Sequence, residues 1–85
     1  MSVHEHMKIL GMPVRDIVTG MKGVVSHISF DLQGCVQVYV TPQAKKDGGL
    51  PDGAWFDTKR MKVIGKEPIM PLPTFAIVPG GQKAP

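Results

Sequence analysis

Three histidines and one cysteine are the side chains of this 85-residue chain best suited to nucleophilic, acid–base or metal chemistry. His4 and His6 flank Glu5 near the start, but two alternate histidines lack the third fixed ligand that a zinc site needs. His27 falls within an expected β-strand, with no serine or cysteine nucleophile evidently placed beside it. Cys35 follows a turn glycine, and burial as a small hydrophobe is the usual fate of such a cysteine. The sequence therefore predicts no catalytic residue, no metal site and no cofactor.

A glycine-containing turn and three cations are the candidate contacts for an anionic ligand. In Gly20-x-x-Gly23, with Lys22 between the glycines, backbone N–H groups of the turn can face a phosphate. The pattern lacks the G-K-[ST] and the following helix of a P-loop, so hairpin geometry is the competing explanation. Arg60 ends an expected tight turn, and its planar fork of donors suits a phosphate. Arg15 is the third candidate cation.

The pair Trp55-Phe56 is the densest aromatic feature of the second half. Successive residues of a strand face opposite sides, so one ring enters the core and the other lies outside; the sequence does not decide which. Tryptophan offers a flat face on which a base can stack, worth ~1–3 kcal/mol per base. Core packing or a homomeric interface is the alternative use of Trp55. The predicted ligand-binding residues are Arg15, Lys22, His27, Trp55 and Arg60.

Five short β-type runs must position these side chains. The runs cover residues 14–18, 24–30, 35–40, 54–57 and 61–64, with a 3₁₀ turn expected at 58–60. Glycine-marked turns are expected at 19–23 and 31–34, and Asp57 is expected to cap the 58–60 turn. Residues 41–53 are too rich in turn formers for helix or strand. This loop carries Lys45 and Lys46, and a loop of this kind can close over an anionic ligand.

The period of two predicts which strand residues are buried. In the third run the valines at 36, 38 and 40 alternate with Cys35, Gln37 and Tyr39, which places the valines in the core and the more polar set toward a partner or solvent. The first run alternates imperfectly and leaves its buried face open. In the second run, the set Val24, Ser26, Ile28 and Phe30 is the better core candidate than the set Val25, His27 and Ser29.

Length and composition predict one small all-β domain. We expect a flexible lead over residues 1–8, a barrel over 9–65 that starts with a turn or strand near 9–12, and an extended proline-rich tail over 66–85. A core this small is marginal in isolation, and a homo-oligomer would relieve that. One cysteine excludes an intramolecular disulfide, and no apolar run suits a signal peptide or membrane span, so we expect a soluble, cytoplasmic protein. The net charge of +3 attracts anions only weakly.

Five short strands with a 3₁₀ turn before the last resemble an SH3-like barrel. The stretch V-R-D-I-V-T-G-M-K-G-V-V-S-H-I, residues 14–28, resembles the KOW-type hairpin of that class, with its usual basic cluster reduced to Lys22. The resemblance implies a module that binds nucleic acid or a protein partner, in transcription, translation or virion assembly.

A second resemblance covers residues 10–73. The segments V-R-D-I-V-T-G-M-K-G-V-V, S-F-D-L-Q-G-C-V-Q, T-P-Q-A-K-K-D-G, W-F-D-T-K-R-M-K-V-I and P-I-M-P-L-P are similar to a group of small bacteriophage and prophage proteins. Phage accessory proteins of this size often counter host defences, some by sequestering cyclic nucleotide messengers. The resemblance thus implies a non-catalytic sponge for an anionic, nucleotide-type signalling ligand in the host cytoplasm.

Two classes of function remain. In the first, the phage accessory protein is a homo-oligomer that holds a cyclic nucleotide or another anionic small ligand at a subunit boundary. In the second, the barrel is an interaction module for nucleic acid or protein. The scattered basic residues favour the first class, with nucleic acid as the second choice. An enzyme is the weakest class, because no carboxylate pair, triad or metal set is spaced for chemistry.

Overall fold

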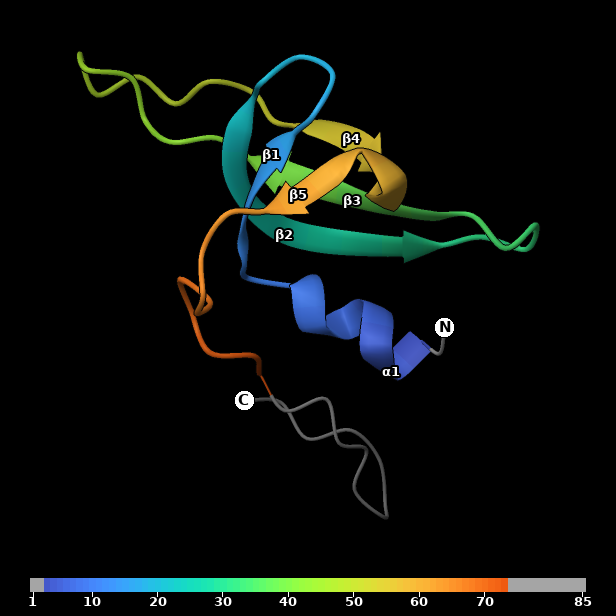
Figure 1. Ribbon diagram of the computed structural model, residues 1–85. Helices are drawn as coiled ribbons and strands as arrows, with labels where there is room; N and C mark the ends of the chain where they lie inside the picture. The colour runs from blue at the N-terminus through green and yellow to red at the C-terminus, as the bar shows by residue number, and fades with distance from the viewer. Residues whose placement is uncertain (1–2, 74–85) are drawn as a thin grey trace, which may run out of the picture.

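Five antiparallel strands form one sheet in the order β4-β3-β2-β1-β5 in the computed structural model, which describes residues 3–73 (Figure 1). The strands are β1 Pro13–Asp16, β2 Lys22–Phe30, β3 Val36–Thr41, β4 Ala54–Asp57 and β5 Met61–Val63. The expected all-β class is confirmed, and each expected run corresponds to one strand. Residues 42–53 form a long connection without helix or strand, as their composition predicts.

Strands β4 and β5 are the two edges of the sheet, and the pairing found among the described residues does not join them. The sheet is therefore not closed, and the expected SH3-like barrel is not confirmed. The 3₁₀ turn η2, Thr58–Arg60, connects the two edges. The carboxylate of Asp57 accepts a hydrogen bond of 2.8 Å from the backbone N–H of Lys59, which confirms the expected cap.

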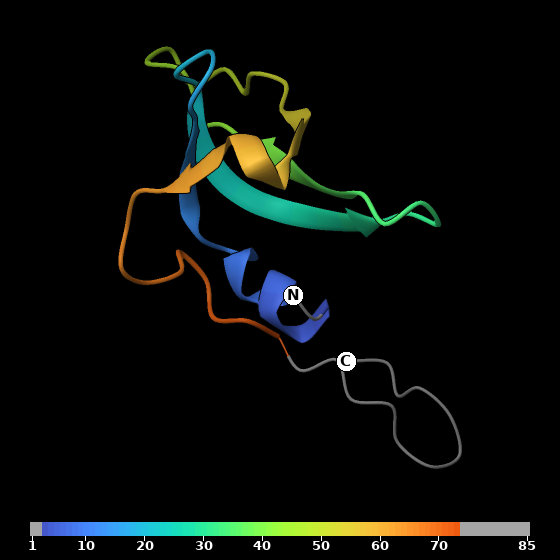
Figure 2. The same ribbon diagram turned by 45° about the vertical axis from the view of Figure 1, so that its right-hand side comes forward.

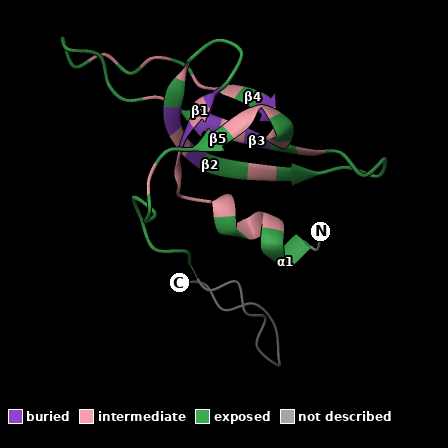
Figure 3. Cartoon of the chain, viewed as in Figure 1, coloured by how far each residue is buried: buried purple, intermediate pink, exposed green. Residues whose placement is uncertain are grey.

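The core lies on one face of the curved sheet and is built mainly of valine (Figure 3). Two valines of β3 are buried, as their alternation predicts. In β4, Phe56 is 8% exposed and Trp55 is 49% exposed, which decides which ring enters the core. The buried apolar residues are Val14, Val25, Val38, Val40 and Phe56, with Ile9, Leu10, Met21, Ile28, Ala54 and Met61 packed against them.

A β-bulge in β2 makes the expected parity wrong for the part of the strand before the bulge, whereas Ile28, after it, packs against the core as expected. Val25 pairs with Val40, whereas the next pair joins His27 to Tyr39, so Ser26 is an extra residue without a partner. One inserted residue moves every side chain after it to the other face. Val25, before the bulge, therefore shares the core face with Ile28, after it, and is buried, whereas the parity of the sequence had placed it outside.

The first described residues are helical, although the sequence analysis expected a flexible lead there. Helix α1, Val3–His6, continues into the 3₁₀ turn η1, Met7–Ile9, and both lie beside β2 (Figure 2). After this turn Gly11 donates to the carbonyl of Val25 at 2.7 Å. The apolar side of η1 explains the difference, because burying Ile9 against the core favours an ordered turn.

The described part of the expected tail, residues 66–73, contains no helix or strand and returns to the start of the domain. Its Ile69 donates a backbone hydrogen bond of 2.8 Å to Gly11. Gly11 has φ +85°, and a Cβ there would lie 3.0 Å from the carbonyl oxygen of Met70, so glycine permits this approach. The rest of the expected tail, 74–85, lies outside the described residues. No helix within residues 3–73 is long and apolar enough to cross a membrane.

Candidate ligand-binding face

Three aromatic side chains stand in one row across β2, β3 and β4. His27 pairs with Tyr39, and Tyr39 pairs with Trp55, so the sheet register places the rings next to one another. The ring centroids of His27 and Tyr39 lie 5.5 Å apart and those of Tyr39 and Trp55 5.4 Å apart, both edge to face. His27 and Trp55 lie 6.3 Å apart. We call these three residues the aromatic row.

The aromatic row lies on the outer face, because its neighbours along each strand point into the core. Val38 and Val40 flank Tyr39 in β3, and both are buried. Gly53 allows the row to be this compact. A Cβ at Gly53 would lie 2.2 Å from the carbonyl oxygen of Val40 and 2.6 Å from the ring of Tyr39. Any larger residue would push the start of β4 away from β3.

Ser26, the extra residue of the bulge, holds the row from one side. Its hydroxyl lies 3.0 Å from Nδ1 of His27 and 2.7 Å from the hydroxyl of Thr41. It also donates to the backbone carbonyl of Tyr39 at 3.4 Å. The sequence shows no nucleophile evidently placed beside His27, whereas in the folded sheet the bulge brings the hydroxyl of Ser26 next to it. These contacts fix the orientation of the imidazole ring.

Three cations stand in a second row on the same outer face. Arg15 pairs with Lys22 of β2 on one side and with Lys62 of β5 on the other. Lys22 and Val24 point to the same face of β2, because both precede the bulge and are two residues apart. Val24 pairs with Thr41, which points to the same face of β3 as Tyr39. The cation row and the aromatic row therefore lie on the same face of the curved sheet. Like charges directly opposite each other destabilise a sheet, and a bound anion would relieve this repulsion.

Arg60 does not join the cation row. Its Nε and Nη2 donate to the two carboxylate oxygens of Asp16, at 2.9 and 2.6 Å. Asp16 is buried and has the parity opposite to that of Arg15, so this ion pair lies on the core side. The Arg60 hydrogen bonds hold the pKa of Asp16 well below its usual range, and the bonds from Thr19 act in the same direction. The guanidinium also lies 5.2 Å over the ring of Phe56.

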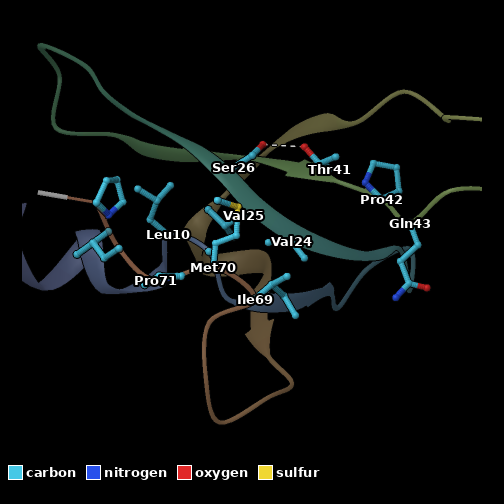
Figure 4. Close-up of a pocket in the computed structure, with 13 residues that line it drawn as sticks. Leu10, Val24, Val25, Ser26, Thr41, Pro42, Gln43, Ile69, Met70 and Pro71 are labelled. Carbon is cyan, nitrogen blue, oxygen red and sulfur yellow. Dashed lines mark hydrogen bonds between the residues drawn. The ribbon is translucent and has the colours of Figure 1, made fainter. Parts of the chain in front are cut away.

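An apolar groove of about 450 Å³ adjoins the aromatic row. Figure 4 shows the hydrogen-bonded Ser26 and Thr41 on one side of it, and Ile69, Met70 and Pro71 on the other. Ser26 and Thr41 belong both to the wall of the groove and to the network that holds His27. The residues that line the groove are Leu10, Gly11, Val24–Ser26, Thr41–Gln43 and Ile69–Pro73.

The structure thus brings together four of the five predicted ligand-binding residues as two pairs and gives the fifth another partner. His27 and Trp55 belong to the aromatic row, Arg15 and Lys22 stand side by side in the cation row, and Arg60 binds Asp16. Tyr39 and Lys62 belong to the two rows and were not among the residues predicted from the sequence. Tyr39 carried a signal, since its parity already placed it on the face turned toward a partner or solvent.

Within residues 3–73, no group of three or more histidine, cysteine, aspartate or glutamate side chains could hold a metal ion. Comparisons of the chain with family profiles, curated proteins and solved structures found no match. The candidate site therefore rests on its geometry.

Proposed function

We propose that this protein is a non-catalytic binding protein whose outer face holds an anionic, nucleotide-type ligand. The observation that carries the proposal is the aromatic row, in which Trp55 is 49% exposed and braced edge to face by Tyr39. A base of any identity that stacks on an aromatic ring gains ~1–3 kcal/mol of binding free energy. A half-exposed tryptophan held in place by its neighbours offers such a surface without the entropic cost of ordering a free side chain.

The phosphates of the ligand belong, in this proposal, to the cation row. Arg15 is half-buried and Lys22 is exposed, so both heads remain within reach of a ligand in solvent. Arg60 is left out, because its fork of donors is already used by Asp16. His27 contributes an aromatic edge, with its Nδ1 engaged by Ser26.

The biological role that we propose is sequestration of a nucleotide signal by a phage accessory protein that counters host defence. This part is supported by the resemblance of residues 10–73 to small phage proteins. A homo-oligomer belongs to the same proposal, because the fully buried apolar core within residues 3–73 contains only the five residues named above, and β4, which carries Trp55, is an open edge of the sheet. Size-exclusion chromatography with light scattering tests the oligomer separately.

A second candidate is an interaction module of SH3-like, KOW type that binds nucleic acid. Its specific support is the cation row, since the sequence alone left these residues scattered and the sheet register aligns them. The strand order with β1 between β2 and β5, and the 3₁₀ turn before β5, agree with such a module. The two candidates share the chemistry of base and phosphate and differ in the size of the ligand.

The test is to incubate the purified protein with cyclic di- and trinucleotides, NAD-derived signals and a short single-stranded oligonucleotide. A bound ligand raises the melting temperature, and heat denaturation then releases it intact for chromatography. Trp55→Ala is expected to weaken binding about 5- to 150-fold, the equivalent of one lost stack. Leu32→Ala, on the fully exposed β2–β3 turn, is the control. If no compound in the panel raises the melting temperature, the proposed function is wrong.

A further inference from the structure

We infer that the ligand of the outer face is a single-stranded oligonucleotide of about four nucleotides that runs along β2, with a base on the aromatic row and phosphates on the cation row. The inference rests on the proposed function, because it needs the stacking site. It selects the nucleic acid strand of the second candidate over the small nucleotide signal of the first, and it adds the direction and the length of that strand.

Strand β2 carries three chemically different positions in sequence along its outer face. Lys22 belongs to the cation row, Val24 and Ser26 line the apolar groove, and His27 belongs to the aromatic row. No other strand of the described sheet contributes to all three. A ligand that uses the whole face must therefore follow β2 across the groove.

The spacing along β2 sets the length of the ligand. His27 follows Lys22 by five residues in the sequence. One of these five steps is taken up by the bulge residue Ser26, so His27 lies four paired positions along the sheet from Lys22. Four steps at about 3.3 Å per residue give roughly 13 Å along β2, and the rows extend sideways from β2 by two strand spacings of about 4.8 Å each, to Trp55 on one side and to Lys62 on the other. A mononucleotide, whose single phosphate adjoins its own sugar, cannot stack on Trp55 and also neutralise three cations at that distance. Several linked nucleotides can.

The groove between the two rows fits the middle of such a strand. Its walls are apolar apart from a few polar groups, among them the paired hydroxyls of Ser26 and Thr41 and the amide of Gln43 (Figure 4). Apolar walls accept a base or a sugar without sequence-specific hydrogen bonds, which suits a single strand bound without strong sequence preference. Charge complementarity comes from the three aligned cations, of which Lys22 lies two positions before the groove residue Val24 on β2.

The experiment measures binding to the full chain by quenching of the fluorescence of Trp55, the only tryptophan. The probes are thymidylates of one, two, four and six nucleotides and a cyclic dinucleotide. Each is titrated at several salt concentrations between about 50 and about 300 mM, a range over which the screening of charges changes strongly. We expect affinity to rise with length up to about four nucleotides and then to level off. For the tetranucleotide, log K should fall with log salt with a slope of about −2, at ~0.7 per phosphate neutralised by the three cations.

Variants that remove single positive charges test whether the cation row binds the phosphates. Lys22→Ala and Lys62→Ala should each weaken the tetranucleotide severalfold and reduce the salt slope by about one phosphate equivalent, while quenching at saturation persists. Lys59→Ala removes one positive charge from an exposed side chain of η2 that belongs to neither row, and it is the matched control, with the salt slope unchanged.

Each alternative outcome is distinct. Equal affinity for the mononucleotide and the tetranucleotide, or salt slopes that Lys22→Ala and Lys62→Ala leave unchanged, would overturn the inference and leave the stacking site intact. Tighter binding of the cyclic dinucleotide than of any linear probe would also overturn it, in favour of a small signalling ligand. No quenching by any probe would remove the proposed function as well.

Discussion

The guanidinium of Arg60 donates two hydrogen bonds to the carboxylate of Asp16, a residue 44 positions earlier in the chain. The contact ties η2, which follows the β4 edge, to the start of the β1–β2 turn. Asp16 also accepts hydrogen bonds from the backbone and hydroxyl of Thr19 at 3.1 and 2.6 Å. One buried carboxylate thus orders the turn and fixes the connection between the two edges of an open sheet.

Stability should fall in acid because of this carboxylate. The pKa of Asp16 is lower in the folded than in the unfolded chain, so its contribution is complete above the ordinary aspartate pKa of about 4 and is lost as pH falls toward the lower folded value. Urea unfolding at pH 7, 4, 3 and 2 should show the advantage of the natural protein over Asp16→Asn shrinking below pH 4. Asp52→Asn, exposed in the long loop, is the control. An advantage independent of pH would contradict this account.

The two rings of β4 should respond very differently to truncation. Phe56→Ala removes a core side chain that packs under Arg60 and should cost about 3–5 kcal/mol of unfolding free energy. Trp55→Ala loses one edge-to-face contact and should cost about 1 kcal/mol. Chemical denaturation measures both. A Trp55 variant as unstable as the Phe56 variant would mean that Trp55 is a structural residue.

Gly53→Ala should damage both the sheet and the site. The added methyl group would overlap the carbonyl of Val40 and the ring of Tyr39, forcing the start of β4 to move. We expect a loss of about 1–3 kcal/mol, as for overpacked positions. The weaker brace behind Trp55 should also reduce ligand affinity.

Gly49→Ala is the control for this variant. It lies in the same loop, and the nearest atom to its added methyl group is a carboxylate oxygen of the exposed Asp47, at 3.0 Å, which also accepts a hydrogen bond of 2.8 Å from the N–H of Gly49; a small rotation of this side chain accommodates the methyl group. Its stability should stay within about 0.5 kcal/mol of the natural protein. If Gly53→Ala were equally silent, the close approach of β3 and β4 at Tyr39 would be wrong.

Local signals were enough to predict the strands and several boundaries. Ala54–Asp57 and Thr58–Arg60 agree with prediction to the residue, because Asp57 provides a cap that is visible in the sequence. The valine alternation of β3 likewise gave the correct buried face.

Long-range relationships were not predictable in the same way. A single extra residue, Ser26, puts Val25 and Ile28 on the same face of β2, and no local property of serine marks a bulge. The partner of Arg60 is equally hidden, since an arginine that binds a phosphate and one that binds Asp16 have the same sequence signature. The cation row arises from strand order, which joins Lys62 to Arg15 across 46 intervening positions.

The central claim is that a base stacks on the outer face at Trp55. The chain has one tryptophan, so a ¹H–¹⁵N correlation spectrum contains a single indole N–H signal that reports on this ring alone. Titration with the thymidine tetranucleotide should move that signal progressively to saturation, together with the amide signals of His27 and Tyr39, while the amide of Leu32 stays in place. An indole signal that does not move while the ligand is in large excess would contradict the claim.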